Sequence, residues 1–137
     1  MRSSEAITCA NIYALAWHVA LANVDRLIDL DVFQQETKGE IVHVVVHLGE
    51  VVGYISVWTA QWFIHHLYVH PNYHRAGFGG SLLNHARDLA GENSLSLKCQ
   101  TANTQAIGFY LSNDFIESSE QGCDEFGTWI QLVQSAR

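Results

Sequence analysis

Hydrophobic residues recur at helical spacing in the N-terminal part of the chain, over about Asn11–Asp31. The pattern is interrupted near Ala22, and Asn23 is suited to cap a second helical segment. Residues 33–38 are polar and predict a loop that Gly39 closes. The chain before Gly39 is therefore predicted to hold a pair of helices.

A nearly continuous run of β-branched and aromatic residues follows this helical region. Ile41–Leu48 has the composition of a strand, and Gly49-Glu50 is suited to a tight turn into a second strand at Val51–Thr59. Trp62–Val69 follows closely and has the same strand-like composition. These three stretches predict an antiparallel meander.

Helical and strand-like patterns then alternate to the end of the chain. The predicted helices are Ser81 to about Leu89 and Thr104 to about Ser112, and the predicted strands are Ser94–Gln100, Phe115–Ser119 and Thr128–Val133. A loop that holds Gly122 and Gly127 is expected between the last two strands. The order strand, helix, strand between Val69 and Leu95 predicts a right-handed parallel crossover. The pattern as a whole predicts a single α/β domain over residues 1–137, with a mixed but mostly antiparallel sheet flanked by helices.

Composition and charge narrow the class of protein. Hydrophobic residues make up 48% of the chain and charged residues 15%, which favours a folded domain over disorder. The formal net charge of −7 argues against nucleic acid as a partner, and no apolar run is long enough to span a membrane. The N-terminus lacks the core of a signal peptide, and the three cysteines are widely separated, so we expect a cytoplasmic protein.

The most informative stretch follows the third predicted strand. Pro71, the only proline in the chain, ends that strand, and Gly77, Gly79 and Gly80 precede an amphipathic helix. A glycine-rich loop that opens a helix directs backbone N–H groups toward one point, where an anion such as phosphate binds. The spacing matches neither the dinucleotide fingerprint G-x-G-x-x-G nor a P-loop, which requires a lysine.

Two motifs resemble those of the GCN5-related N-acetyltransferase (GNAT) superfamily. H-R-A-G-F-G, beginning at His74, is similar to the acyl-CoA loop of that family, although the family usually has Gln or Arg at the first position. The stretch Asn103–Phe115 resembles N-x-x-A-x-x-F-Y-x-x-x-G-F, with Asp114 in place of the last Gly. The resemblance implies the acyl-CoA N-acyltransferase fold. That fold usually begins with a strand, which is expected to be short or absent here because Met1–Thr8 has a poor strand pattern.

The resemblance also implies a binding site for acetyl-CoA as cosubstrate. The pantetheine arm would lie along the strand edge Leu67-Tyr68-Val69, as an added strand does. The pyrophosphate would meet the backbone amides of Arg75, Ala76, Gly77, Phe78, Gly79 and Gly80. Asn103 would contact the pantetheine, and its position before a helix also suits an N-cap, so both roles are open.

For catalysis, the resemblance implies that Tyr110 protonates the departing CoA thiolate. The amine must also lose a proton, and His65 is the candidate general base because it precedes the strand edge that would hold the thioester. Two other positions for a base in the family hold Phe63 and Lys98, which are poorly suited. His66 is expected to point away from His65, since neighbouring strand residues alternate in direction. No compact set of metal ligands is visible, so no metal is expected.

These features together predict an enzyme that transfers an acetyl group from acetyl-CoA to a primary amine of a small molecule, peptide or protein. The resemblance implies direct attack in a ternary complex, and the nucleophile motif G-x-S-x-G is absent. Two alternatives stay open: a non-catalytic acyl-CoA-binding or regulatory module of the same fold, and an interaction domain whose strands build a dimer. An enzyme of this kind is also compatible with a homodimer.

Overall fold

The computed structural model describes residues 2–22 and 26–135, and in these residues six strands form one mixed sheet in the order β1-β2-β3-β4-β6-β5. The strands are β1 (Ile41–His47), β2 (Glu50–Trp58), β3 (Phe63–Val69), β4 (Ser96–Gln100), β5 (Phe115–Asp124) and β6 (Gly127–Gln134). The helices are α1 (Ser3–Ala20), α2 (Leu30–Glu36), α3 (Phe78–Ala90) and α4 (Thr104–Ser112), with a short 3₁₀ turn at Pro71–Tyr73. The mixed sheet and its flanking helices confirm the predicted fold class.

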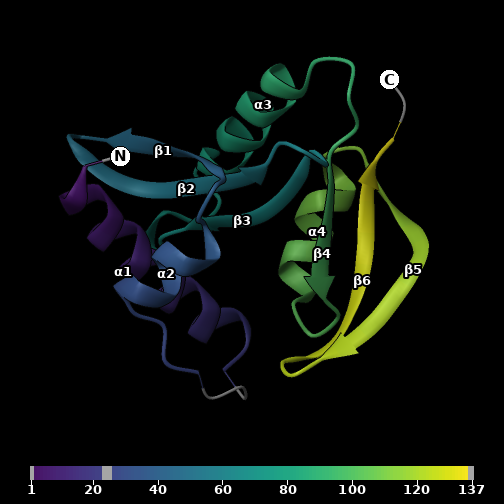
Figure 1. Cartoon of the computed structure of the whole chain (residues 1–137), viewed down its shortest axis with the longest axis horizontal. Coiled ribbons are helices and arrows are strands. Elements are labelled where there is room, and N and C mark those ends of the chain that lie inside the picture. The colour runs from purple at the N-terminus through teal and green to yellow at the C-terminus, as the bar shows by residue number, and fades with distance from the viewer. Residues whose placement is uncertain (1, 23–25, 136–137) are drawn as a thin grey trace.

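The sheet splits between its two central strands. β3 and β4 are parallel, as predicted, but they pair only at Phe63 with Ser96 and at Ile64 with Leu97. Beyond these pairs the strands diverge, and β4, β6 and β5 leave the direction of β1–β3 (Figure 1). The split leaves one edge of β3 from Leu67 to Val69 without a strand partner among the described residues.

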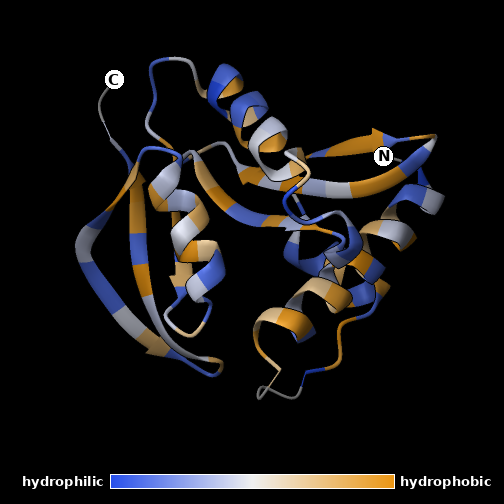
Figure 2. Ribbon diagram, turned by 180° about the vertical axis from the view of Figure 1, so that it is seen from behind, coloured by the Kyte–Doolittle hydropathy of each residue, from blue (hydrophilic) through white to orange (hydrophobic). Residues whose placement is uncertain are grey.

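Helices cover both faces of the sheet, because the side chains of each strand alternate between them. On β2, Tyr54 packs against α1 and α2, whereas its neighbour Ile55 packs against α3 and the strands on the other face. Figure 2 shows mostly hydrophobic residues along the edge strand β1, whereas the opposite edge strand, β5, is mostly hydrophilic. None of the described helices has both the length and the apolar character that a membrane crossing requires.

The core on the α3 side makes a direct test of this packing possible. Leu83 of α3 has 0% of its surface exposed, whereas Leu89 of the same helix is 40% exposed. Leu83→Ala is expected to lower the free energy of unfolding by about 2–5 kcal/mol, since it leaves a cavity in the core. Urea denaturation measures this loss, and Leu89→Ala is the matched control with a much smaller loss. Equal losses in both variants would contradict the described packing.

The N-terminal helices differ from the prediction. α1 begins at Ser3 rather than near Asn11, and Glu5 accepts a hydrogen bond from the backbone N–H of Arg2 at its start. No strand precedes this helix in the described residues. The polar stretch predicted as a loop is mostly the helix α2, because the Asp29 carboxylate caps it and Phe33 anchors it in the core. The expected cap at Asn23 lies outside the described residues.

Three further boundaries differ for reasons of backbone geometry. The tight turn of the first hairpin is Leu48-Gly49, where both residues have positive φ, as a two-residue hairpin turn requires. α3 begins at Phe78 rather than Ser81, so two of the glycines form its first turn. Gly122 lies in β5 rather than in a loop, directly opposite Trp129 of β6.

Candidate active site

Two cavities border the split in the sheet and share one wall. The first has a volume of about 520 Å³ and holds the side chains of His65 and His66. The second has a volume of about 580 Å³ and is bounded by Arg75 and the glycine loop. The shared wall consists of Ala20, Leu67, Tyr68, Asn103, Ala106 and Tyr110. A molecule that fills both cavities would therefore pass Tyr68 and Tyr110.

The glycine loop gives the second cavity the features of an anion site. Gly77 adopts a left-handed conformation with φ of 88° and caps α3. The amides of the first helical turn after it have no partner within the helix, and the N-terminus carries a partial positive charge. Gly79 and Gly80 line the cavity, and a Cβ atom on Gly79 would lie 3.3 Å from the ring of Phe109. The absence of side chains lets a ligand approach the backbone closely.

The predicted cofactor residues divide into two groups. Most of them line the second cavity: Leu67, Tyr68, Val69, Arg75, Gly77, Gly79, Gly80 and Asn103. Ala76 does not line this cavity, and neither does Phe78, whose ring packs near His47 at a centroid distance of 5.3 Å. Their backbone amides remain candidates for the pyrophosphate, but their side chains do not face it.

His74, the departure from the family motif, has a local partner. Its Nε2 lies 2.8 Å from the carbonyl oxygen of Val69 and donates a hydrogen bond to it. This bond ties the glycine loop to the end of β3. The histidine therefore helps to fix the loop beside the strand edge.

Tyr110 and Asn103 come from the same helix and reach the junction of the cavities. Asn103 caps α4, because its Oδ1 accepts a hydrogen bond from the backbone amide of Ala106 at 3.2 Å. Asn103 also lines both cavities. Tyr110 is 6% exposed, and burial raises the pKa of its phenol well above the ordinary value. The phenol therefore carries its proton at neutral pH.

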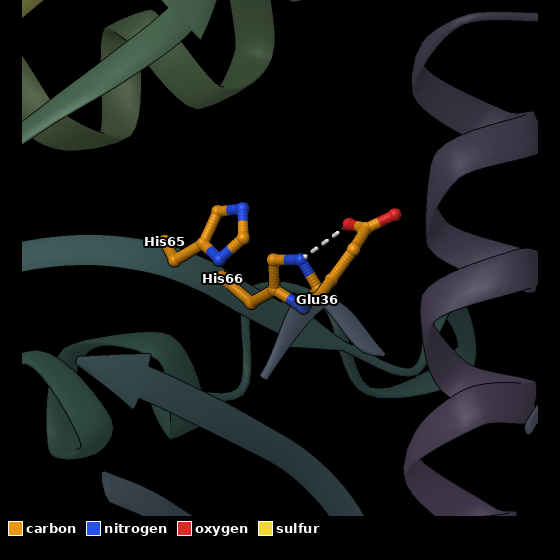
Figure 3. A group of neighbouring side chains, drawn as sticks. All are labelled: Glu36, His65 and His66. Carbon is orange, nitrogen blue, oxygen red and sulfur yellow. Dashed lines mark hydrogen bonds and ion pairs between the residues drawn. The ribbon is translucent and has the colours of Figure 1, made fainter. Parts of the chain in front are cut away.

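A β-bulge in β3 places His65 and His66 in the first cavity together. Ser56 of β2 pairs with His66 and Val57 pairs with Ile64, so His65 is the extra residue between the two pairs. The two imidazole rings are 4.5 Å apart and lie side by side above β3 (Figure 3). The prediction that they point in opposite directions was wrong, because the bulge breaks the alternation of an ideal strand.

Glu40 orients the ring of His65. One carboxylate oxygen of Glu40 lies 2.8 Å from His65 Nδ1, and the hydroxyl of Ser56 donates to the other oxygen. A carboxylate only accepts hydrogen bonds, so Nδ1 carries the proton in this contact and Nε2 has a free lone pair when the ring is neutral. The Glu40 side chain is 8% exposed, whereas that of His65 is 36% exposed.

His66 belongs to a buried network around Glu36. Its Nε2 lies 3.0 Å from Glu36 Oε1, and its Nδ1 lies 2.9 Å from the hydroxyl of Tyr54. Tyr13 donates to the same oxygen of Glu36, and Arg26 pairs with the other oxygen. Burial raises the pKa of Glu36, but the hydrogen bonds from His66 and Tyr13 and the charge of Arg26 outweigh it and lower the pKa to about 2. Burial lowers the pKa of His66, so the pair is neutral His66 beside an ionised Glu36.

Arg26 closes the far side of the first cavity. Its guanidinium lies over the rings of Trp17 and Phe126, 4.7 and 4.5 Å from their centroids, and donates to the Tyr13 hydroxyl. Sequence reasoning missed Arg26, Glu36 and Glu40. Only the two histidines in succession gave a signal here, and their acidic partners lie 25 and 30 residues away in the chain.

Comparisons with known proteins identify the family. The model of the acetyltransferase (GNAT) family matches residues 9–115. The chain belongs to the GNAT family. This range holds both motifs, the two histidines and their acidic partners, so the junction of the two cavities lies within the family domain. No curated protein sequence matches the chain significantly.

Solved structures of GNAT-fold proteins superimpose along most of the chain. The apo form of YjaB from Escherichia coli has a TM-score of 0.82 and 19% identity, over 100% of this chain and 95% of that one. The PaiA N-acetyltransferase of Thermoplasma acidophilum, in complex with coenzyme A, has a TM-score of 0.78 and 14% identity, over 96% and 94%. A ribosomal-protein-alanine N-acetyltransferase from Brucella melitensis has a TM-score of 0.76 and 22% identity, over 98% and 96%. These TM-scores establish a shared fold.

The glycine loop can be tested by a single substitution in the GNAT protein. Gly79→Asp would place a side chain against Phe109 and a negative charge beside the proposed pyrophosphate position. We expect the affinity for CoA to fall at least about tenfold, measured by calorimetry, because repulsion between like charges costs more than 1.4 kcal/mol in a partly buried site. Glu92→Gln, in the turn that follows the C-terminal end of α3, is the control. An unchanged affinity in a folded Gly79→Asp protein would contradict the assignment.

Proposed function

We propose that this protein transfers an acetyl group from acetyl-CoA to a primary amine, by direct attack in a ternary complex. The observation that carries this proposal is the junction of the two cavities. One cavity presents helix N-terminal amides and a free strand edge, which suit the pyrophosphate and the pantetheine. The other presents a histidine with a free lone pair. Tyr110 lies in the wall between them.

The residues at the junction account for each proton in the reaction. An amine at neutral pH is mostly ammonium, and His65 Nε2 would accept its proton, directly or through a water, while Nδ1 stays bonded to Glu40. The free amine then attacks the thioester carbonyl, and the C–S bond breaks as the amide forms. The electron pair of that bond leaves on the CoA sulfur, and Tyr110 would supply the proton that converts the thiolate to a thiol. The nitrogen releases its second proton in this step, and that proton restores, through solvent, the one that Tyr110 gives up.

The charge of the first cavity supports a cationic acceptor. Glu36, the last residue of α2, and Glu40, which directly precedes β1, both approach the two histidines. Arg26 compensates only one of these carboxylates by a direct ion pair. The acceptor is therefore proposed to be an amine of a small molecule or of a peptide or protein.

Incubation of the protein with acetyl-CoA and a library of amines tests this function. Release of free CoA thiol, together with an acetylated amine of the expected mass, is the expected result. Binding of CoA with no turnover on any amine would favour the non-catalytic module of the same fold. Failure to bind CoA would favour an interaction domain and overturn the proposal.

A further inference from the structure

The group Glu36, His65 and His66 has the composition and spacing of a metal site. One nitrogen of each imidazole and one carboxylate oxygen of Glu36 lie within 4.8 Å of one another. Figure 3 shows the ring of His66 directed at the carboxylate of Glu36, with the ring of His65 beside it above β3. Two donors on a tetrahedral zinc ion, with bonds of about 2.0–2.1 Å, are roughly 3.4 Å apart. Glu36 Oε1 and His66 Nε2 are already 3.0 Å apart, which is close to that spacing.

We propose that Glu36, His65 and His66 bind a divalent transition-metal ion such as Zn²⁺. Two imidazoles and one carboxylate form a ligand set that zinc takes in proteins, with a fourth position left for water or another small ligand. All three residues line the first cavity, from which a fourth ligand would reach the ion. Mg²⁺ and Ca²⁺ fit poorly, since they prefer sites made of oxygen ligands alone.

The groups around the three ligands are arranged as they are around metal-binding histidines. A histidine that binds a metal through one nitrogen usually donates its other N–H to a carboxylate or another acceptor, which fixes the ring. Glu40 holds Nδ1 of His65 in this way and leaves Nε2 for the metal. The hydroxyl of Tyr54 lies beside Nδ1 of His66 and can accept from it once Nε2 binds a metal. The hydroxyl of Tyr13 holds the carboxylate of Glu36.

The local charge favours a dication. Glu36 and Glu40 together bring two negative charges to the site, and Arg26 brings one positive charge on the side of Glu36 away from His66. An ion in the site would neutralise the remaining excess of negative charge. It would also replace the hydrogen bond between His66 and Glu36 with two stronger contacts.

Direct binding is measured on the metal-free protein after dialysis against EDTA. Zn²⁺ is titrated in competition with a chromophoric chelator, and Co²⁺ serves as a spectroscopic probe of tetrahedral coordination. We expect one ion per chain and a visible Co²⁺ spectrum. His65→Ala, His66→Ala and Glu36→Gln are each expected to weaken Zn²⁺ binding by more than about 100-fold, and Glu40→Gln by roughly 10–100-fold.

Matched controls separate this site from the other histidines and the exposed thiol. His43 and His85 form a second imidazole pair with centroids 4.2 Å apart, and Cys123 is exposed. His43→Ala and Cys123→Ser are expected to bind Zn²⁺ as the unmodified protein does. Because His66 is buried, its replacement could unfold the protein, so thermal melting is measured for every variant. If His66→Ala fails to fold, His65→Ala, at an exposed position, is the decisive variant.

The outcomes are distinct. Loss of binding in His65→Ala with retention in His43→Ala supports the site. No competition with the chelator, or equal loss in His43→Ala, overturns it. One further expectation rests on the proposed function: the bound ion would inhibit acetyl transfer, because it would compete with the amine for His65. Zn²⁺ binding by a protein that acetylates no amine would uphold the metal site while refuting the function, so the two failures are distinguishable.

Discussion

Tyr110→Phe is expected to lower kcat by roughly 10²–10⁴-fold while the affinity for acetyl-CoA stays within a few-fold. The substitution removes one oxygen atom from a buried ring and leaves its packing against Phe115, 5.4 Å away, in place. The lost hydroxyl is the one proposed to protonate the CoA thiolate, and its raised pKa ensures that it carries the proton at neutral pH. Steady-state kinetics and calorimetry with acetyl-CoA measure the two quantities separately.

The leaving group provides an internal control for this prediction. A thiol of low pKa departs as a thiolate without needing a proton, so an acetyl thioester of such a thiol depends less on a general acid. The deficit of Tyr110→Phe is therefore expected to shrink with the activated thioester. A deficit of the same size with both thioesters would show that Tyr110 acts by packing, and unmodified turnover in the variant would assign the proton to another group.

His65→Ala is expected to lower kcat by roughly 10²–10⁴-fold on an amine that is protonated at the assay pH, because no group then accepts the proton of the ammonium. Glu40→Gln is expected to produce a smaller loss, since Glu40 acts through His65 by fixing its Nδ1–H and the free lone pair on Nε2. All assays are run with EDTA so that metal binding does not contribute.

A double-mutant cycle distinguishes positioning from a structural role. If Glu40 acts only through His65, Glu40→Gln lowers kcat in the unmodified protein and causes no further loss in the His65→Ala background. Additive losses would contradict the pairing and would indicate that Glu40 supports the cavity by itself. Glu50→Gln, at an exposed position in β2, is the control that leaves kcat unchanged.

Local patterns in the sequence determined much of the fold. The helix α4 begins and ends where the sequence predicts, because Asn103 caps it and its hydrophobic residues follow a helical period. The parallel pairing of β3 with β4 followed from the order strand, helix, strand, since a short connection cannot join parallel strands. The glycines that the sequence singled out line the second cavity, and the positive φ at Gly77 and the open first turn of α3 depend on adjacent residues alone.

The arrangement of side chains in the first cavity depends on the tertiary structure. An ideal strand sends neighbouring side chains to opposite faces, and only the pairing of β3 with β2 reveals the bulge that brings His65 beside His66. Glu36 was assigned to a polar loop, because a helix as short as α2 gives almost no periodic signal, and Glu40 lay between that loop and the first predicted strand. Their meeting with the histidines depends on contacts across 25 to 30 residues, which the packing of α2 on the sheet creates and no local pattern encodes.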